Sequence, residues 1–215
     1  DMAHIAGLVA AEAIPSPVPY ADFVTFTTYK TLMGGRGGVI LCKRPHAARI
    51  DRSVFPGCQG TPAMNMIAAK AICFHRAGKS AFRDIQCQTL SNARSMAQEL
   101  ASRGYRIVSG GTDNHLVLID LRSKRVTGDQ AEKQLEAVGL IVNRNPIPND
   151  QENPQTAGGL RLGTPAITVR GMKEPEVERI VAWIDIVLTN HGRKAIQENV
   201  AREIAMLCQQ FPVPC

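Results

Sequence analysis

The chain has 215 residues, of which 44% are hydrophobic and 5% aromatic, so it can build a globular core from aliphatic side chains. Its formal net charge is +6, but Lys and Arg are scattered rather than grouped with aromatic residues, which argues against nucleic-acid binding. No apolar run approaches the roughly 20 residues of a membrane helix, and the six cysteines form no CxxC pair, so neither a membrane span nor a zinc or disulfide framework is indicated.

The rest of the composition favours a cytoplasmic protein that handles small molecules. The spacing of the cysteines suggests no pairing, as expected in a reducing compartment. The positive charge has two interpretations, a solvated surface or a few arginines that bind phosphate or carboxylate groups. The chain begins at Asp1 and runs directly into an apolar segment, residues 5–14, and we expect this start to be a truncation point.

The first half begins with a strand, a turn and a second strand. Residues 22–29 are rich in β-branched and aromatic side chains and predict a strand, and residues 39–42 predict a shorter one. Residues 30–38, KTLMGGRGG, form a glycine-rich turn between them. Two helical patterns follow, a buried helix at residues 62–76 and a long helix at residues 79–103. Together these elements predict an α/β layer.

The second half alternates short strands with helices. The predicted strands are residues 105–109, 115–121 and 140–143. The predicted helices are residues 129–138, 174–189 and 193–211. Each of these helices carries an apolar stripe on one side, which indicates packing against a sheet or another helix. A proline-rich loop is expected at residues 146–154, and the pattern as a whole favours a small α+β domain.

One lysine stands out by its position. Lys30 follows the first predicted strand and opens the glycine-rich turn, so the backbone would hold it rigidly at the edge of a cleft. Such a lysine can form a Schiff base with an aldehyde cofactor if its surroundings favour the neutral amine. The alternative is an ordinary solvent-facing lysine at a strand end, and the spacing alone favours that alternative.

Six segments resemble motifs of the serine hydroxymethyltransferase family. The first two are DMAHIAGLVA at residues 1–10 and TFTTYKTLMGGRGG at residues 25–38, which is similar to the family's cofactor-lysine motif. The other four are VFPGCQGTP, GTDNHL, NRNPIPND and GLRLGTPAITVRG. The segments occur in the family's order and span nearly the whole chain, which makes the resemblance specific.

The resemblance implies an α/β fold, the aspartate-aminotransferase-like fold of pyridoxal-phosphate-dependent transferases (fold type I). Residues 1–90 would be the C-terminal part of the large cofactor-binding domain, and residues 91–215 the small C-terminal α+β domain. It also implies a homodimer or tetramer with active sites shared between subunits. Half of a domain exposes sheet edges and apolar surface, so we expect the isolated chain to associate or to be poorly soluble.

The implied cofactor is pyridoxal 5′-phosphate, bound to Lys30 as an aldimine. By resemblance, Asp1 would pair with its pyridine nitrogen, for which an exposed terminus is the alternative, and His4 would lie near its phenolic oxygen. The remaining residues assigned to the cofactor or the chemistry are Thr27, Tyr29, Arg36, Gly57, Gly60 and Thr61. The last three belong to a loop whose backbone N–H groups would approach the phosphate of a neighbouring subunit.

The resemblance also assigns the substrates. Arg161 would bind the carboxylate of the amino acid through its planar guanidinium, although a surface arginine on a strand is the alternative. Asn145 would contact the pterin ring of a folate, and Phe55 would reach the more distant part of that folate from the partner chain. The implied reaction interconverts serine and glycine, with tetrahydrofolate as the one-carbon acceptor.

Several residues depart from the family's motifs. Tyr29 stands where the family usually has histidine; the other departures are Phe26, Met33, Gly35 and Thr61. They also suit a related aldolase or transaldolase, or a hydroxymethyltransferase for α-methylserine, since all of these cleave a Cα–Cβ bond. The family's catalytic groups upstream of the lysine motif are absent, so we expect this chain alone to be inactive. A non-catalytic fragment or split subunit remains an alternative, although Lys30, Arg161 and Asn145 together favour an enzyme.

Overall fold

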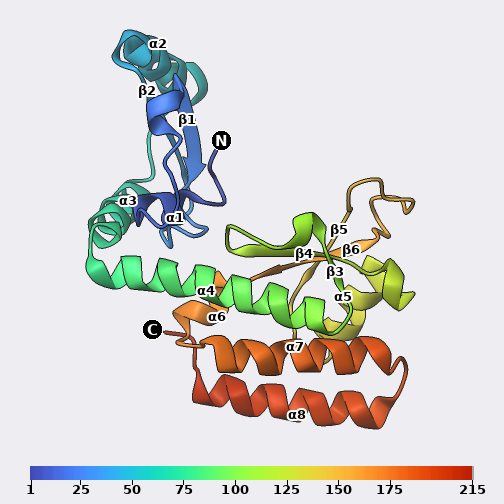
Figure 1. Ribbon diagram of the computed structural model, residues 1–215. Coiled ribbons are helices and arrows are strands. Elements are labelled where there is room, and N and C mark those ends of the chain that lie inside the picture. The colour runs from blue at the N-terminus through green and yellow to red at the C-terminus, as the bar shows by residue number, and fades with distance from the viewer. Residues whose placement is uncertain (215) are drawn as a thin grey trace. The chain divides into compact units, whose positions relative to one another are not determined.

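The computed structural model describes residues 1–214, and Cys215, one of the six cysteines of the sequence, lies outside the described residues. The chain folds into two compact units, Asp1–Cys87 and Gln88–Cys215, each of which combines helices with a small antiparallel sheet (Figure 1). The expected mixed α/β class is therefore confirmed. Within residues 1–214, no helix has both the length and the apolar character needed to cross a membrane.

Unit 1 is built on a two-stranded antiparallel ribbon. Strands β1 (Phe23–Thr27) and β2 (Gly38–Cys42) confirm the two strands expected around the glycine-rich turn. Val24 and Phe26 alternate with exposed neighbours on β1 and are buried. The helices of this unit are α1 (Ala6–Ala10), α2 (Ala47–Arg52), α3 (Met64–Ala77) and the first turns of α4 (Ser80–Ser102). Between α2 and α3 lies a distorted helical turn, Ser53–Cys58.

The helix expected at residues 62–76 forms as α3, but the prediction that it is buried is wrong. Cys73 is its only buried residue, whereas Ile67, Ile72 and Phe74 are exposed. These side chains lie about 100° or more around the helix from Cys73, so a single covering surface cannot reach them all. The apolar composition of the segment was therefore a poor guide to its burial.

Unit 2 places its core on one face of a four-stranded antiparallel sheet. The strands, in sheet order, are β3 (Arg106–Ile107), β4 (Leu116–Asp120), β6 (Gly159–Gly163) and β5 (Asn143–Asn145). The helices are α5 (Gly128–Ala137), α6 (Pro165–Val169), α7 (Glu174–Thr189), α8 (Lys194–Gln210) and the rest of α4. Val117, Ile119, Leu160 and Leu162 point from the sheet into the core, so the alternate residues of β4 and β6 lie on the opposite face.

The helix predictions for unit 2 are confirmed, and two strand predictions need correction. The six residues of the apolar stripe of α7 are all buried, namely Val177, Ile180, Val181, Ile184, Val187 and Leu188. The strand expected at residues 105–109 pairs over two residues only, because Ser109 and Gly110 adopt positive φ angles of 63° and 77° and turn the chain. The strand expected at residues 140–143 is wrong, since pairing begins at Asn143, and Leu140 and Val142 pack against the core without a strand partner.

Candidate active site

Lys30 lies in a tight turn that follows the end of β1 by three residues. The turn is closed by backbone hydrogen bonds from the Met33 N–H to the Lys30 carbonyl (2.9 Å) and from the Gly34 N–H to the Thr28 carbonyl (2.7 Å). Met33 adopts a φ of 60°, which is uncommon for a residue with a side chain. The backbone on both sides of Lys30 is thus held in one conformation.

Two buried threonines hold this turn in place. The Thr28 hydroxyl donates to the carbonyls of Gly35 (2.5 Å) and Gly37 (3.2 Å) within the turn. The Thr31 hydroxyl donates to the His4 carbonyl (2.8 Å) and accepts from the Gly7 N–H (3.0 Å), which joins the turn to α1. Both threonines are almost completely inaccessible to solvent, so these bonds are shielded from competition with water.

Tyr29 faces two cations. The guanidinium carbon of Arg36 lies 4.8 Å from the centre of the tyrosine ring, and the Lys30 Nζ lies 5.6 Å from it. Both distances lie within the range of a cation–π interaction, which holds a positive charge over an aromatic face. The residue that departs from the family's histidine therefore contacts the lysine and a second positive group.

A surface cavity of about 1160 Å³ lies in unit 1. Its walls are the β1–β2 ribbon, the segment that follows α2, and helix α3. The predicted site residues that line it are Asp1, Thr27, Arg36, Phe55 and Gly60. The other predicted residues of this unit do not line it; they are His4, Tyr29, Lys30, Gly57 and Thr61. The cavity thus collects carboxylate, cationic and aromatic groups near the ribbon that leads to the lysine turn.

Asp1 is held by the ribbon despite its exposure. Its carboxylate accepts from the Ala3 N–H (2.9 Å) and from the Thr25 hydroxyl (2.7 Å), and the Thr27 hydroxyl donates to the Ala3 carbonyl (3.1 Å). A backbone bond from the Met2 N–H to the Thr25 carbonyl (2.8 Å) holds the same segment. Asp1 therefore presents a fixed negative charge at the cavity.

Lys70 lines the same cavity, and no motif of the sequence pointed to it. It lies on α3, and its Nζ donates to the Gly38 carbonyl (3.1 Å) at the start of β2. A side chain on Gly37 would clash with the Lys70 side chain at 2.2 Å, so the absence of one lets the lysine pack directly against the backbone of the ribbon. The only signal in the sequence was its spacing of four from Met66, which puts both on one side of the helix.

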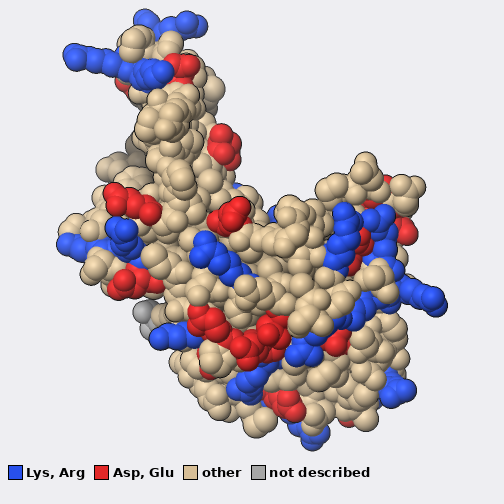
Figure 2. Space-filling view, viewed as in Figure 1, with Lys and Arg blue, Asp and Glu red and all other residues tan. Residues whose placement is uncertain are grey.

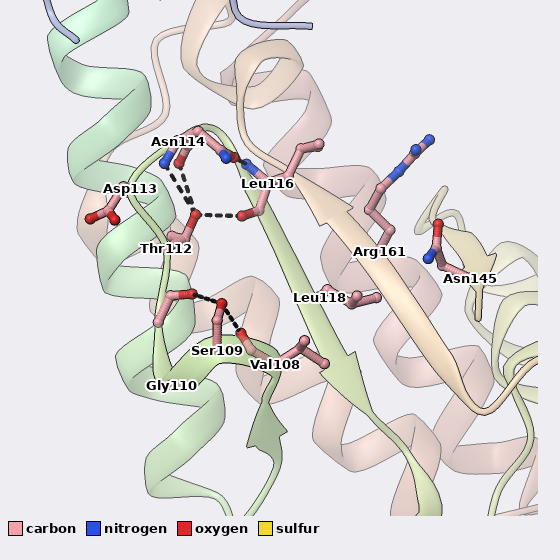
Figure 3. A pocket seen from close by; sticks show the side chains of 11 residues that line it. Val108, Ser109, Gly110, Thr112, Asp113, Asn114, Leu116, Leu118, Asn145 and Arg161 are labelled. Carbon is pink, nitrogen blue, oxygen red and sulfur yellow. Dashed lines mark hydrogen bonds between the residues drawn. The ribbon is translucent and has the colours of Figure 1, made fainter. Parts of the chain in front are cut away.

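A second cavity, of about 550 Å³, lies in unit 2 on the sheet face opposite the core (Figure 3). Arg161 of β6 pairs in register with Leu118 of β4 and Asn143 of β5, and its guanidinium donates to the Asn143 side chain (3.2 Å). Asn145 lines the same cavity and donates to the Pro146 carbonyl (2.7 Å). The structure therefore brings together the two substrate residues that the sequence assigns to this unit.

The other wall of this cavity is the loop of residues 108–114, of which the sequence singled out only residues 111–116, as a motif match. The Thr112 hydroxyl donates to the Leu116 carbonyl (2.6 Å), and the Asn114 side chain accepts from the Leu116 N–H (2.8 Å). These bonds make a compact turn at the start of β4 (Figure 3). The two adjacent glycines, Gly110 and Gly111, and the short polar side chains that follow them were the signals for a turn.

A half-buried carboxylate, that of Asp150, orders the loop that follows Asn145. Burial raises the pKa of Asp150, but the backbone N–H groups of Gly158 (2.8 Å), Glu152 (3.0 Å) and Ile147 (3.1 Å) outweigh it and hold that pKa below its usual value. The charged form of Asp150 is thus stabilised at neutral pH. Its three hydrogen bonds close the loop next to the cavity.

The family model for serine hydroxymethyltransferase matches residues 1–184, which include both cavities. The chain belongs to the serine hydroxymethyltransferase family. A serine hydroxymethyltransferase from Nitrosomonas europaea is 52% identical over 213 residues, an alignment that covers 99% of this chain and 51% of that protein. The chain therefore spans about half the length of this curated relative.

Membership of the serine hydroxymethyltransferase family confirms the resemblance read from the six motifs. The family match ends within α7, so α8 lies outside it, although the alignment with the relative covers almost all of the chain. Both cavities and the lysine turn fall inside the matched residues. The roles of individual residues at these sites stay predictions.

Proposed function

We propose that this chain forms part of a pyridoxal 5′-phosphate-dependent hydroxymethyltransferase that interconverts serine and glycine, with tetrahydrofolate as the one-carbon acceptor. The observation that carries the proposal is the rigid turn at Lys30, held by buried Thr28 and Thr31, in a chain of this family. The proposal includes fold type I, a cofactor domain at residues 1–90, a small domain at residues 91–215, and a cytoplasmic location.

The groups present in unit 1 fit such a cofactor. Lys30 offers a primary amine for an aldehyde, Asp1 offers a carboxylate held in place for a ring nitrogen, and Arg36 offers a positive charge for an anion. When bound, the cofactor supplies an electron sink for the electrons released at the substrate Cα. The chain's part is to bind the ring, fix its orientation and hold a negative charge opposite the ring nitrogen.

We assign the remaining residues of unit 1 to the surroundings of the cofactor. The His4 carbonyl accepts a hydrogen bond from the Thr31 hydroxyl, and the Thr27 hydroxyl donates to the Ala3 carbonyl, so His4 and Thr27 lie in segments that are bonded to each other and to the lysine turn. Gly57, Gly60 and Thr61 are exposed, and a side chain on Gly60 would meet no atom within 4 Å, so a ligand can approach this backbone closely. In the proposal this loop serves the phosphate of a neighbouring subunit, in a homodimer or tetramer.

Unit 2 would bind the substrates. The Arg161 guanidinium has five N–H donors and, among the described residues, one hydrogen bond, to Asn143, so it retains donors for the carboxylate of serine or glycine. Asn145 lines the same cavity and would contact the pterin of the folate. Phe55, 61% exposed in unit 1, is free to reach the folate of a partner chain.

The test is covalent trapping at Lys30 in the intact protein. After incubation with pyridoxal 5′-phosphate and reduction with borohydride, mass spectrometry should find the reduced adduct on the peptide that contains Lys30. Lys30→Ala should abolish both this adduct and serine-to-glycine turnover with tetrahydrofolate. Lys43→Ala is the control, because Lys43 is an exposed lysine of the same unit whose partner is Asp22. An adduct distributed over surface lysines, or full turnover by Lys30→Ala, would contradict the proposal.

A further inference from the structure

A buried glutamine of α4 contacts the lysine turn. Gln86 lies on α4 within unit 1, and only 1% of its surface is exposed. Its Nε2 donates a hydrogen bond of 2.8 Å to the Thr31 carbonyl. Thr31 directly follows Lys30, so α4 holds the backbone one residue from the proposed cofactor lysine.

Thr31 is confined from several directions. Its hydroxyl bonds to the His4 carbonyl and the Gly7 N–H, and its carbonyl accepts from Gln86. The Thr31 carbonyl also lies so close to α1 that a side chain on Gly7 would meet it at 2.2 Å. Because the side chain and the carbonyl of Thr31 are both held, the backbone next to Lys30 has little freedom to rotate.

The buried side chain of Gln86 is only partly satisfied by its hydrogen bond to Thr31. Within the described residues its Oε1 is buried and has no hydrogen-bond partner. An unpaired buried acceptor is unfavourable, so a methionine of similar shape would pack here without that penalty. It would, however, leave the Thr31 carbonyl without the amide donor. Gln86 therefore contributes at this position through its donor.

We infer that Gln86 is a positioning residue for Lys30: its amide holds Thr31 and thereby sets the direction in which the Lys30 amine leaves the turn. The inference rests on the proposed function of Lys30 as the cofactor lysine. Gln86 is not expected to touch the cofactor or the substrate, because its donor is used by the backbone. Its effect should appear in how fast the Lys30 amine reacts, and in the geometry of the product.

The experiment compares Gln86→Met with Gln88→Met in the intact protein. Gln88 lies two residues further along α4 and donates to the side chains of Asn92 and Glu174, so the control removes the same amide from the same helix. The rate of covalent attachment of pyridoxal 5′-phosphate at Lys30 is measured by borohydride trapping over time. The circular dichroism of the bound cofactor and the thermal midpoint of the cofactor-free protein are recorded beside it.

We expect Gln86→Met to slow attachment on the order of tenfold and to change the cofactor dichroism, since small misplacements of a reacting group cost large factors in rate. Gln88→Met should attach at the rate of the unaltered protein even where its thermal midpoint falls equally. Equal rates in both variants would overturn the inference. No adduct at Lys30 in the unaltered protein would overturn the proposed function, and this inference with it.

A second variant covers the case in which Gln86→Met does not fold. Gln86→Glu keeps the shape of the side chain but donates to the Thr31 carbonyl only when its carboxyl is protonated. Its attachment rate relative to the unaltered protein should therefore rise as the pH is lowered. A ratio that does not change with pH would count against a role for the donor.

Discussion

The two units are stabilised in different ways. Among the described residues, unit 2 buries twenty-five hydrophobic residues in one cluster, whereas the cluster of unit 1 has eight. Most of the large apolar side chains that are exposed belong to unit 1, among them Ile40, Leu41, Ile67, Ile72 and Phe74. Since buried apolar area is the main source of folding free energy, unit 2 has by far the larger apolar contribution.

In unit 1, buried polar groups hold the turn that contains Lys30. Thr28, Thr31 and Gln86 are each at most 1% exposed, and all three hold the turn that contains Lys30. Hydrogen bonds are directional, so they fix a backbone conformation more closely than apolar contacts of similar strength. The comparison teaches that a reactive group can be held precisely in a region that has little apolar core.

The largest effect is expected from a cavity in the core of unit 2. Leu135 of α5 is completely buried, so Leu135→Ala should reduce the free energy of unfolding by about 3 kcal/mol. Met206→Ala on α8 of unit 2 is the matched control, because Met206 is 53% exposed and the loss should be near zero. The single tryptophan, Trp183, is buried in unit 2, and its fluorescence during urea unfolding measures this loss. Equal losses in the two variants would break the comparison.

A smaller effect, confined to unit 1, is expected from Gly7→Ala. The added methyl group would meet the Thr31 carbonyl at 2.2 Å and force α1 away from the lysine turn. Overpacking of this kind costs about 2 kcal/mol. Hydrogen exchange of the peptides that contain residues 1–10 and 28–38 should accelerate, while unfolding followed by Trp183 should change little. A change seen only by Trp183 would contradict the assignment of this contact to unit 1.

Asp120 should make the free energy of unfolding of unit 2 sensitive to acid. Hydrogen bonds from Arg122 (2.8 Å), and then from Arg106 (2.9 Å), hold the pKa of this buried carboxyl far below its usual value. A lowered folded-state pKa stabilises the fold above the unfolded pKa of about 4, and the contribution is lost as the pH falls below it. Asp120→Asn should therefore cost about 2 kcal/mol at neutral pH and progressively less towards pH 3.

Urea unfolding followed by Trp183 at both pH values checks this prediction. Asp22→Asn is the control, since Asp22 is exposed, pairs with Lys43 in unit 1 and should not alter the unfolding of unit 2. A cost for Asp120→Asn that stays constant with pH would mean that the charge on Asp120 is not the source of its stabilising effect.

Sequence periodicity predicted those parts of the fold in which an apolar stripe is covered by another part of the chain. The stripe of α7 was identified correctly because Val177, Ile184 and Leu188 recur at helical spacing and the core of unit 2 covers them. Burial of α3 was not predictable, because composition does not say which surface covers a helix. The false strand at residues 140–143 has a related cause: apolar side chains can pack on a core without any strand pairing.

The candidate site was predictable where a motif names its residues and not where the fold supplies them. Lys30, Arg161 and Asn145 came from local motifs. Gln86 and Lys70 did not. Gln86 lies 55 residues after its partner Thr31, and Lys70 lies 32 residues after its partner Gly38. Such contacts depend on tertiary packing, for which a single sequence carries no local signal.

The smallest effect concerns Tyr29, the departure from the family motif next to the lysine. Its ring lies under the Arg36 guanidinium and near the Lys30 ammonium, and it is 39% exposed. A cation–π contact at such a site contributes about 0.5–1 kcal/mol, which corresponds to roughly a two- to fivefold change in an opening equilibrium. Tyr29→Leu should accelerate hydrogen exchange of residues 29–38 by that factor, whereas Tyr29→Phe, which keeps the ring, should not. If Tyr29→Phe exchanged as fast as Tyr29→Leu, the hydroxyl rather than the ring would be the stabilising group, and the turn would be held entirely by hydrogen bonds.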